Sequence, residues 1–168
     1  MRINRAWAMP NKDTFSIKPI RVLVDKVVGQ PGITADPFSN GKRYADLTND
    51  LDESLEADSH EDALDFLRGL PESHCSGLLF DPPYSPRQVA ESYKKLGRTV
   101  DFKTTQSSYW SRLRREIGRV VVPGGLVLTC SWNSGGIGKF AGFEIEEILI
   151  VCHGGWHNDT ICVLDRRL

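Results

Sequence analysis

The chain has 168 residues, 40% of them hydrophobic and 26% charged, with a net charge of -1. This composition excludes wholesale disorder and fits one domain with a sizeable core, and the near-zero charge means that nucleic-acid binding would require a local basic face. The first residues are polar, no apolar run is as long as a membrane span, and the four cysteines lack a metal-like spacing, so we expect no signal peptide, no membrane partner and reduced core thiols in a cytoplasmic protein.

The amino-terminal part of the chain contains one clear helix and one short strand. Residues 1–17 have no clean periodicity, and we expect them to form an irregular N-terminal arm. Pro19 suits the first turn of a helix that ends at Gly29. The apolar face of this helix comprises Ile20, Leu23, Val24, Val27 and Val28. Residues 33–35 then predict a strand that stops at Asp36-Pro37-Phe38.

The middle of the chain repeats the pattern of a strand followed by Asp and Pro. Residues 44–48 predict a further strand, and residues 59–67 predict a helix. An apolar strand over residues 78–80 then ends abruptly in Asp81-Pro82-Pro83-Tyr84. Since two strands end in an Asp-Pro step, we expect an active edge built from neighbouring strand ends.

A long polar stretch and a second amphipathic helix follow. Residues 85–108 are too many for a plain connection, so we predict a substrate-binding loop with a short helix near residues 89–95. Four apolar residues at helical spacing predict a core-facing helix with a basic flank: Tyr109, Leu113, Ile117 and Val120.

The end of the chain reads as three strands. Pro123-Gly124-Gly125 turns the chain into an apolar strand over residues 126–132, and residues 145–152 and 160–164 predict two strands joined by a hairpin loop. Strands that alternate with helices and end in a hairpin predict an α/β doubly wound sheet, mostly parallel, with one antiparallel strand. We expect residues 1–168 to form a single domain.

The Asp81-Pro82-Pro83-Tyr84 stretch suits a planar amino group. The two prolines fix φ and lack an N–H, so the backbone is extended and its carbonyls are not consumed by a helix. A carboxylate and a backbone carbonyl can then accept the two amino hydrogens while Tyr84 stacks on the attached heterocycle. On local sequence alone, a stiff turn after a strand is an equally good interpretation.

Taken together, these segments resemble the S-adenosylmethionine-dependent amino-group methyltransferases, especially those that act on adenine N6 or cytosine N4 of DNA. Asp81-Pro82-Pro83-Tyr84 is similar to their catalytic motif, and the helix that opens with Lys18-Pro19, followed by Asp36-Pro37-Phe38, is similar to their first cofactor-binding segment. Pro123-Gly124-Gly125 and the terminal hairpin also match. The resemblance implies a Rossmann-like methyltransferase sheet, S-adenosylmethionine as cofactor and no metal.

The resemblance also implies roles for individual residues. Asp81 and the Pro82 carbonyl would hold the amino group, Pro83 would keep the loop rigid, and Tyr84 would stack on the base. Asp50 would bind the ribose hydroxyls, although an Asx-turn is its alternative role, and Asp58 rivals Asp62 for the adenine amino group. The complete cofactor set is Phe15, Lys18, Asp36, Pro37, Phe38, Asp50 and Asp62.

A base inside a duplex cannot reach such a site, so a DNA substrate would be flipped out or single-stranded. The candidate substrate-binding residues come from three segments: Arg87, Lys103, Thr105, Gln106 and Ser107; Trp132 and Asn133; His157 and Asn158. A zinc site at His153 and His157 is disfavoured because no thiol pair lies nearby in sequence.

The leading prediction is a small DNA adenine-N6 methyltransferase with short or relaxed sequence specificity. The chain shows no separate target-recognition domain, so a homodimer or a partner protein would have to supply further specificity. Cytosine N4 or an RNA base is the alternative within the same chemistry. The alternative of another class is a catalytically idle nucleic-acid-binding module, because residues 39–44 leave too little chain for the usual first helix.

Overall fold

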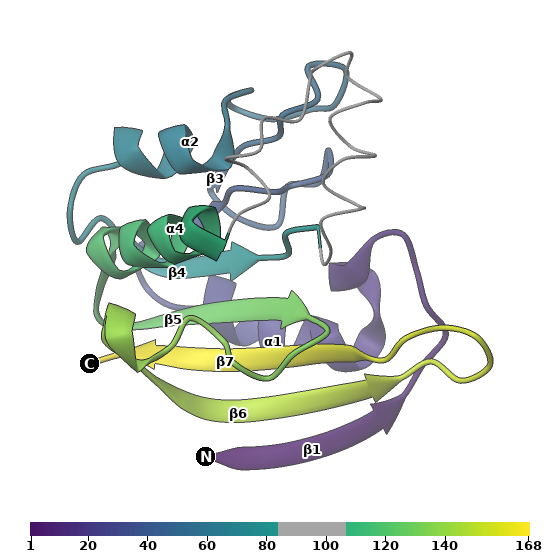
Figure 1. Ribbon diagram of the computed structural model, residues 1–168. Coiled ribbons are helices and arrows are strands. Elements are labelled where there is room, and N and C mark those ends of the chain that lie inside the picture. The colour runs from purple at the N-terminus through teal and green to yellow at the C-terminus, as the bar shows by residue number, and fades with distance from the viewer. Residues whose placement is uncertain (84–106) are drawn as a thin grey trace.

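The computed structural model describes residues 1–83 and 107–168, except the side chains of residues 107 and 108 (Figure 1). The elements are β1 (Arg2–Trp7), η1 (Thr14–Ser16), α1 (Lys18–Val28), β2 (Ile33–Asp36), β3 (Leu47–Thr48), α2 (Ala63–Gly69), β4 (Cys75–Phe80), α4 (Ser107–Val120), β5 (Val121–Ser131), η2 (Lys139–Ala141), β6 (Phe143–Cys152) and β7 (Thr160–Arg167). None of the helices in these ranges has the length and hydropathy needed to cross a bilayer.

The described strands form one seven-stranded sheet in the order β1-β6-β7-β5-β4-β2-β3. Within this sheet β7 runs antiparallel to β5 and β6, and the other pairs are parallel. The predicted doubly wound α/β sheet with one antiparallel strand in a C-terminal hairpin is therefore confirmed. Figure 1 shows α1 on one face of the sheet and α4 on the other, with α2 beside α4.

Both amphipathic helices pack as their periodicity predicts. The four buried residues of α1 share one core cluster with Leu128 and Cys130 of β5, whereas Tyr109, Leu113, Ile117 and Val120 of α4 share the opposite core cluster with Val127. Side chains alternate between the two faces of a strand, so β5 must be apolar at successive positions to serve both clusters. The four cysteines are buried thiols, as expected.

The irregular arm is the clearest error in the predicted elements. Arg2–Trp7 form β1, which pairs in parallel with β6 from Arg2↔Glu147 to Trp7↔Cys152. Most residues of this edge strand are exposed. Because neither face of the strand is buried in the core, its sequence does not alternate between hydrophobic and polar residues. As a result the periodicity gives no strand signal there.

Three other elements have boundaries that differ from the predicted ones. The strand over 44–48 shrinks to Leu47–Thr48, because the carboxylate of Asp46 instead accepts hydrogen bonds from the backbone N–H and the hydroxyl of Thr34. The helix over 59–67 begins only at Ala63, since residue 59 forms a bridge with residue 49. The Pro123-Gly124-Gly125 turn lies inside β5, at a register shift against β4. The helix predicted near 89–95 lies outside the described residues.

Gly77 allows α1 to approach β4 closely. A Cβ at Gly77 would lie 2.8 Å from both the carbonyl oxygen and Cγ1 of Val27, whereas a Cβ at Gly69, the last residue of α2, would meet nothing within 4 Å. Gly77→Ala should therefore destabilise the protein by about 1 to 3 kcal/mol through overpacking. Gly69→Ala should be neutral or stabilise it by up to about 1 kcal/mol. Urea unfolding of both variants checks this, and equal shifts of their midpoints would contradict the close helix–sheet contact.

Candidate active site

Two Asp-Pro strand ends meet at one edge of the sheet. Strands β2 and β4 pair in parallel, with Ala35 opposite Leu78, so Asp36-Pro37 and Asp81-Pro82 leave the sheet on the same side. The chain runs outward from β2 to β3 and then returns to β4 and β5 on the other side. The strand order thus reverses between β2 and β4, which is where open α/β sheets bind ligands.

Asp36 is fully buried at this reversal point. Its Oδ1 accepts a hydrogen bond from the backbone N–H of Phe38 at 3.0 Å, but its Oδ2 has no hydrogen-bond partner among the described residues. The pKa of the Asp36 carboxyl is raised to about 8, mainly by burial. The hydrogen bond from the Phe38 N–H opposes this rise, and the charges of Asp81, Asp50 and Asp13 add to it. A buried oxygen with no partner and several acidic neighbours is suited to a cationic ligand group.

The predicted catalytic motif is described up to Pro83. Asp81 and Pro83 are half-buried, Pro82 is buried, and all three follow β4 directly. Tyr84, expected to stack on the base, lies outside the described residues. The structure thus brings Asp81 beside Asp36 and leaves the stacking role of Tyr84 a prediction.

Asn49, which the sequence analysis missed, holds the loops around Asp36 together. Its Nδ2 donates to the carbonyl oxygens of Pro37 (3.2 Å) and Glu61 (3.0 Å). Its Oδ1 accepts hydrogen bonds from the Ser59 hydroxyl (2.8 Å) and the Glu61 N–H (3.0 Å). All four hydrogen-bonding positions of the amide are used, so Asn49 is a positioning residue. Its place directly after a strand was the only sequence signal.

Asp50 forms the Asx-turn that was its alternative role. Its Oδ1 accepts a hydrogen bond from the backbone N–H of Asp52 at 2.9 Å, and its Oδ2 accepts one from Asn40 at 2.7 Å. Each carboxylate oxygen can accept a second hydrogen bond. A ribose contact therefore stays a prediction that is compatible with the turn.

Asp62 and its rival Asp58 both support the fold. Asp62 caps α2 by accepting a hydrogen bond from Leu64 N (2.9 Å) and another from the Tyr109 hydroxyl (2.9 Å). Asp58 accepts hydrogen bonds from the guanidinium of Arg43, and these hold the pKa of its carboxyl well below its usual range; Thr48 adds to this effect. The paired Asp58 is the weaker candidate for an adenine contact.

The remaining predicted cofactor residues differ in exposure. Phe15 is buried in the same core cluster as α1, and the centroid of its ring lies 5.7 Å from that of Tyr44 in an edge-on arrangement. Lys18 is exposed at the start of α1. Pro37 is buried, and the half-buried ring of Phe38 packs edge-on against Phe80 at 5.7 Å. Phe38 is thus better placed than Phe15 to contact a ligand beside Asp36.

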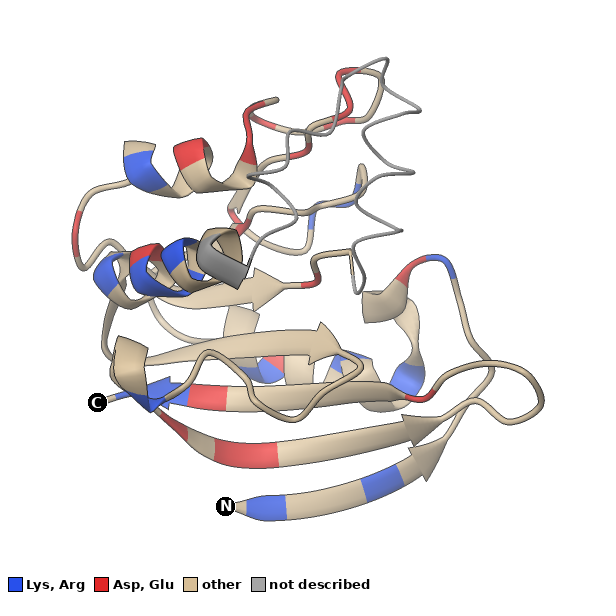
Figure 2. Ribbon diagram, viewed as in Figure 1, with Lys and Arg blue, Asp and Glu red and all other residues tan. Residues whose placement is uncertain are grey.

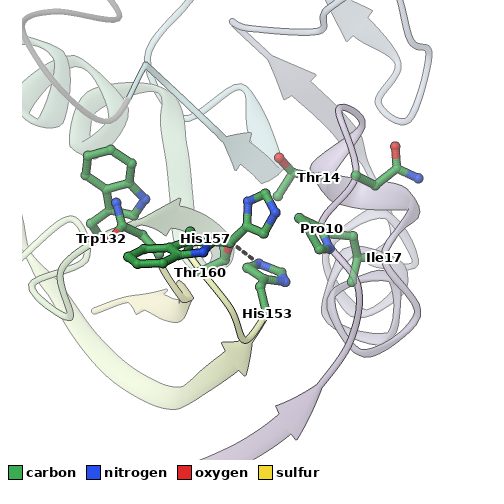
Figure 3. A pocket seen from close by; sticks show the side chains of 10 residues that line it. Pro10, Thr14, Ile17, Trp132, His153, His157 and Thr160 are labelled. Carbon is green, nitrogen blue, oxygen red and sulfur yellow. Dashed lines mark hydrogen bonds between the residues drawn. The ribbon is translucent and has the colours of Figure 1, made fainter.

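A pocket of about 310 Å³ lies beside the segment after β5 and the β6–β7 loop (Figure 3). Three predicted residues line it, namely Trp132, His157 and Asn158, whereas exposed Asn133 is not part of its lining. The other predicted substrate residues, Arg87, Lys103, Thr105 and Gln106, lie outside the described residues, as does the side chain of Ser107. No cluster of three or more potential metal ligands occurs in residues 1–83 and 107–168.

Charge divides the edge of the sheet into two sides. Figure 2 shows acidic residues gathered on the loop after β3 and basic residues along α4. The loop over 50–62 contains seven Asp or Glu residues and no Lys or Arg. This side repels phosphates and attracts cations, so a nucleic acid would have to approach over other elements.

No protein-family model matches the sequence, and no curated protein matches it. Among solved structures, the chain is similar to TrmN from Thermus thermophilus, with 17% identity and a TM-score of 0.58 over 90% of this chain and 49% of that one. It is also similar to 1,6-didemethyltoxoflavin-N1-methyltransferase from Burkholderia thailandensis, with 11% identity and a TM-score of 0.59 over 89% of this chain and 77% of that one. The chain has a methyltransferase fold.

A methyltransferase homolog from Pyrococcus horikoshii shows the same likeness, with 13% identity and a TM-score of 0.54 over 86% of this chain and 65% of that one. The present chain spans about half the length of TrmN. At these identities the comparisons establish the fold, and they confirm the predicted Rossmann-like methyltransferase sheet.

The buried carboxyl of Asp36 predicts a pH-dependent stability. Because its pKa in the folded protein is raised from 3.8 to about 8, folding favours the protonated form. This contribution is fully present below about pH 4 and is lost as the pH rises towards 8. Asp36→Asn cannot ionise, so the ligand-free variant should match the wild type at pH 4 and exceed its unfolding free energy by more than about 1 kcal/mol at pH 9. Denaturant unfolding at both pH values measures this, and a variant less stable than the wild type at pH 9 would contradict it.

Proposed function

We propose that this protein transfers a methyl group from S-adenosylmethionine to the exocyclic N6 of adenine in DNA, with short or relaxed sequence specificity. One observation carries the proposal: Asp36-Pro37 and Asp81-Pro82 emerge side by side at the reversal point of a sheet with a methyltransferase fold. Ligands of open α/β sheets bind at such a point.

The proposed cofactor position lies on the acidic side of the edge. S-Adenosylmethionine carries a sulfonium and an ammonium group, and the Oδ2 of Asp36, which has no partner in residues 1–83 and 107–168, suits such a cation. Asp36, Pro37 and Phe38 would then face its methionine end, Asp50 its ribose and Asp62 its adenine. The toxoflavin methyltransferase, whose structure contains S-adenosylhomocysteine, supports this choice of cofactor.

The cofactor supplies an activated methyl group on a good leaving group, so the protein mainly has to align the acceptor. The lone pair of an adenine amino group is delocalised into the ring. Hydrogen bonds from its two N–H groups to the Asp81 carboxylate and the Pro82 carbonyl would make the nitrogen more tetrahedral and turn its lone pair towards the methyl group. An N–C bond forms as the S–C bond breaks, and Asp81 or water takes the released proton.

The acceptor would reach Asp81 as a flipped or single-stranded base. Arg87 and Lys103 would contact phosphates, and Thr105, Gln106 and Ser107 would read base edges. A homodimer or a partner protein is a proposed source of further specificity. Cytosine N4 and RNA bases are alternative acceptors with the same chemistry. Analysis of the methylated product distinguishes them from adenine N6 of DNA.

An idle binding module is the competing function, and one observation favours it. Residues 37–46 connect β2 to β3 without a helix, and a turn closed by Lys42 N and the Ser39 carbonyl at 2.9 Å takes its place. The outer wall of the cofactor site is correspondingly reduced. Calorimetric titration of S-adenosylmethionine separates the two functions, because an idle module shows no saturable binding.

Asp81→Ala tests the proposed chemistry. The variant should lose methyl transfer to DNA by at least about 100-fold, because the amino group is no longer oriented or polarised. Asp65→Ala is the matched control, since Asp65 is an exposed carboxylate on α2 that pairs with Arg68. Transfer of labelled methyl groups to duplex DNA, single-stranded DNA and RNA, followed by nucleoside analysis, measures both. N6-methyladenine formed equally by Asp81→Ala would refute the mechanism, and product confined to RNA would refute the substrate.

A further inference from the structure

The pocket of Figure 3 is built from three parts of the chain that are far apart in sequence. The segment between β1 and α1 forms one wall, Trp132 after β5 forms another, and the β6–β7 loop completes it. The lining residues are Pro10, Asn11, Thr14, Ile17, Trp132, His153, Trp156, His157, Asn158 and Thr160.

The lining of the pocket contains no Lys, Arg, Asp or Glu. It offers indole rings from two tryptophans, the amides of Asn11 and Asn158, and the hydroxyl of Thr14. Amides both donate and accept hydrogen bonds, and indoles stack on flat rings. The pocket therefore suits an uncharged heteroaromatic ring with hydrogen-bonding edges, and its lining presents no Lys or Arg to a phosphate and no Asp or Glu to an ammonium group.

The amino-terminal wall is held in place by β1. The parallel pairing of β1 with β6 continues in a hydrogen bond from Ala8 N to the Cys152 carbonyl at 3.1 Å. Buried His153 then joins both walls: its Nδ1 donates to the Ala8 carbonyl at 2.8 Å, and its Nε2 lies 2.8 Å from the Thr160 hydroxyl. A carbonyl can only accept, so the proton of Nδ1 is fixed. His153 is a positioning residue that keeps the wall beside the hairpin loop.

The pocket lies on the opposite side of Asp81 from Asp36. Strand β5 pairs with β4 at Phe80↔Thr129 and with β7 at Ser131↔Ile161, so Trp132 follows between the Asp81 loop and the hairpin loop. Asp36 follows β2 on the other side of β4. A methyl donor beside Asp36 and an acceptor ring beside Trp132 would therefore flank Asp81.

We propose that this pocket binds the methyl-accepting ring, an uncharged nucleobase, and that the wall presented by β1 selects which base is accepted. This inference rests on the proposed function in taking the ring as the methyl acceptor. Trp132 supplies the stacking surface, and Thr14 with Asn11 contacts the edge of the ring. Strand β1 thus serves the site, because it delivers residues 10–17 across the end of the sheet.

The test is the binding of radiolabelled adenosine and cytidine to the full chain by equilibrium dialysis, with saturating S-adenosylhomocysteine to occupy the cofactor site. Trp132→Ala should weaken adenosine binding about tenfold through lost stacking, and Trp132→Phe should restore most of it. Phe140→Ala is the control and should bind adenosine as the wild type does. Phe140 is an exposed aromatic residue in η2, before the start of β6, whereas the pocket lies at the end of β6.

A second pair of variants tests the selecting wall. Thr14→Val keeps the shape of the side chain and removes its hydroxyl, so it should change the ratio of adenosine to cytidine affinity by about threefold or more. Ser16→Ala removes a hydroxyl from the same η1 turn outside the pocket and should leave the ratio unchanged. Adenosine affinity of Trp132→Ala within about twofold of the wild type, or an unchanged ratio in Thr14→Val, would overturn the proposal.

Methyl transfer is measured separately on the same variants. Adenosine binding that depends on Trp132, in a protein that transfers no methyl group, supports the base pocket and contradicts the proposed function. Methyl transfer with an unchanged KM for nucleic acid in both Trp132→Ala and Thr14→Val supports the proposed function and overturns the pocket.

Discussion

The buried carboxyl of Asp36 is the constraint around which the functional edge is organised. One of its oxygens accepts a hydrogen bond from the Phe38 N–H, and the other has no partner among the described residues. Its position at the end of a parallel strand beside β4 puts it next to Asp81, and the resulting proximity of acids raises its pKa further. Such a group destabilises the empty protein, and a cation would offset this cost.

The order of the strands places different kinds of side chain on the two sides of β4. Strands β2 and β3 lie on one side of β4, and their loops are acidic and held by Asn49. Strands β5 and β7 lie on the other side, where the lining of the pocket contains no Lys, Arg, Asp or Glu. In the proposed function, a cationic donor and a neutral acceptor ring would therefore have separate places, with Asp81 between them. The connection from β2 to β3 contains no helix, so the proposed donor side would be less enclosed.

Periodicity predicted the elements that are buried and regular. Helices α1 and α4 were found because apolar residues recur on one face, and β5 because it is buried on both faces. Strand β1 was missed because an exposed edge strand has no such pattern. The resemblance to a known family predicted roles for Asp36 and Asp81. It could not predict that residues 10–17 form a wall of the pocket. That wall depends on a contact between His153 and Ala8, which are 145 residues apart in sequence, and only the folded chain brings them together.

Proton release on cofactor binding tests the central claim most directly. At pH 7 the free Asp36 carboxyl, with its pKa at about 8, is mostly protonated, and a cation bound beside it would lower that pKa. Titration calorimetry of S-adenosylmethionine in buffers of different ionisation enthalpy counts the protons released. The structure predicts release of close to one proton per cofactor at pH 7, less at pH 9, and none in Asp36→Asn. Absence of saturable binding, or binding at pH 7 without proton release, would contradict the assignment of Asp36 to the cofactor site.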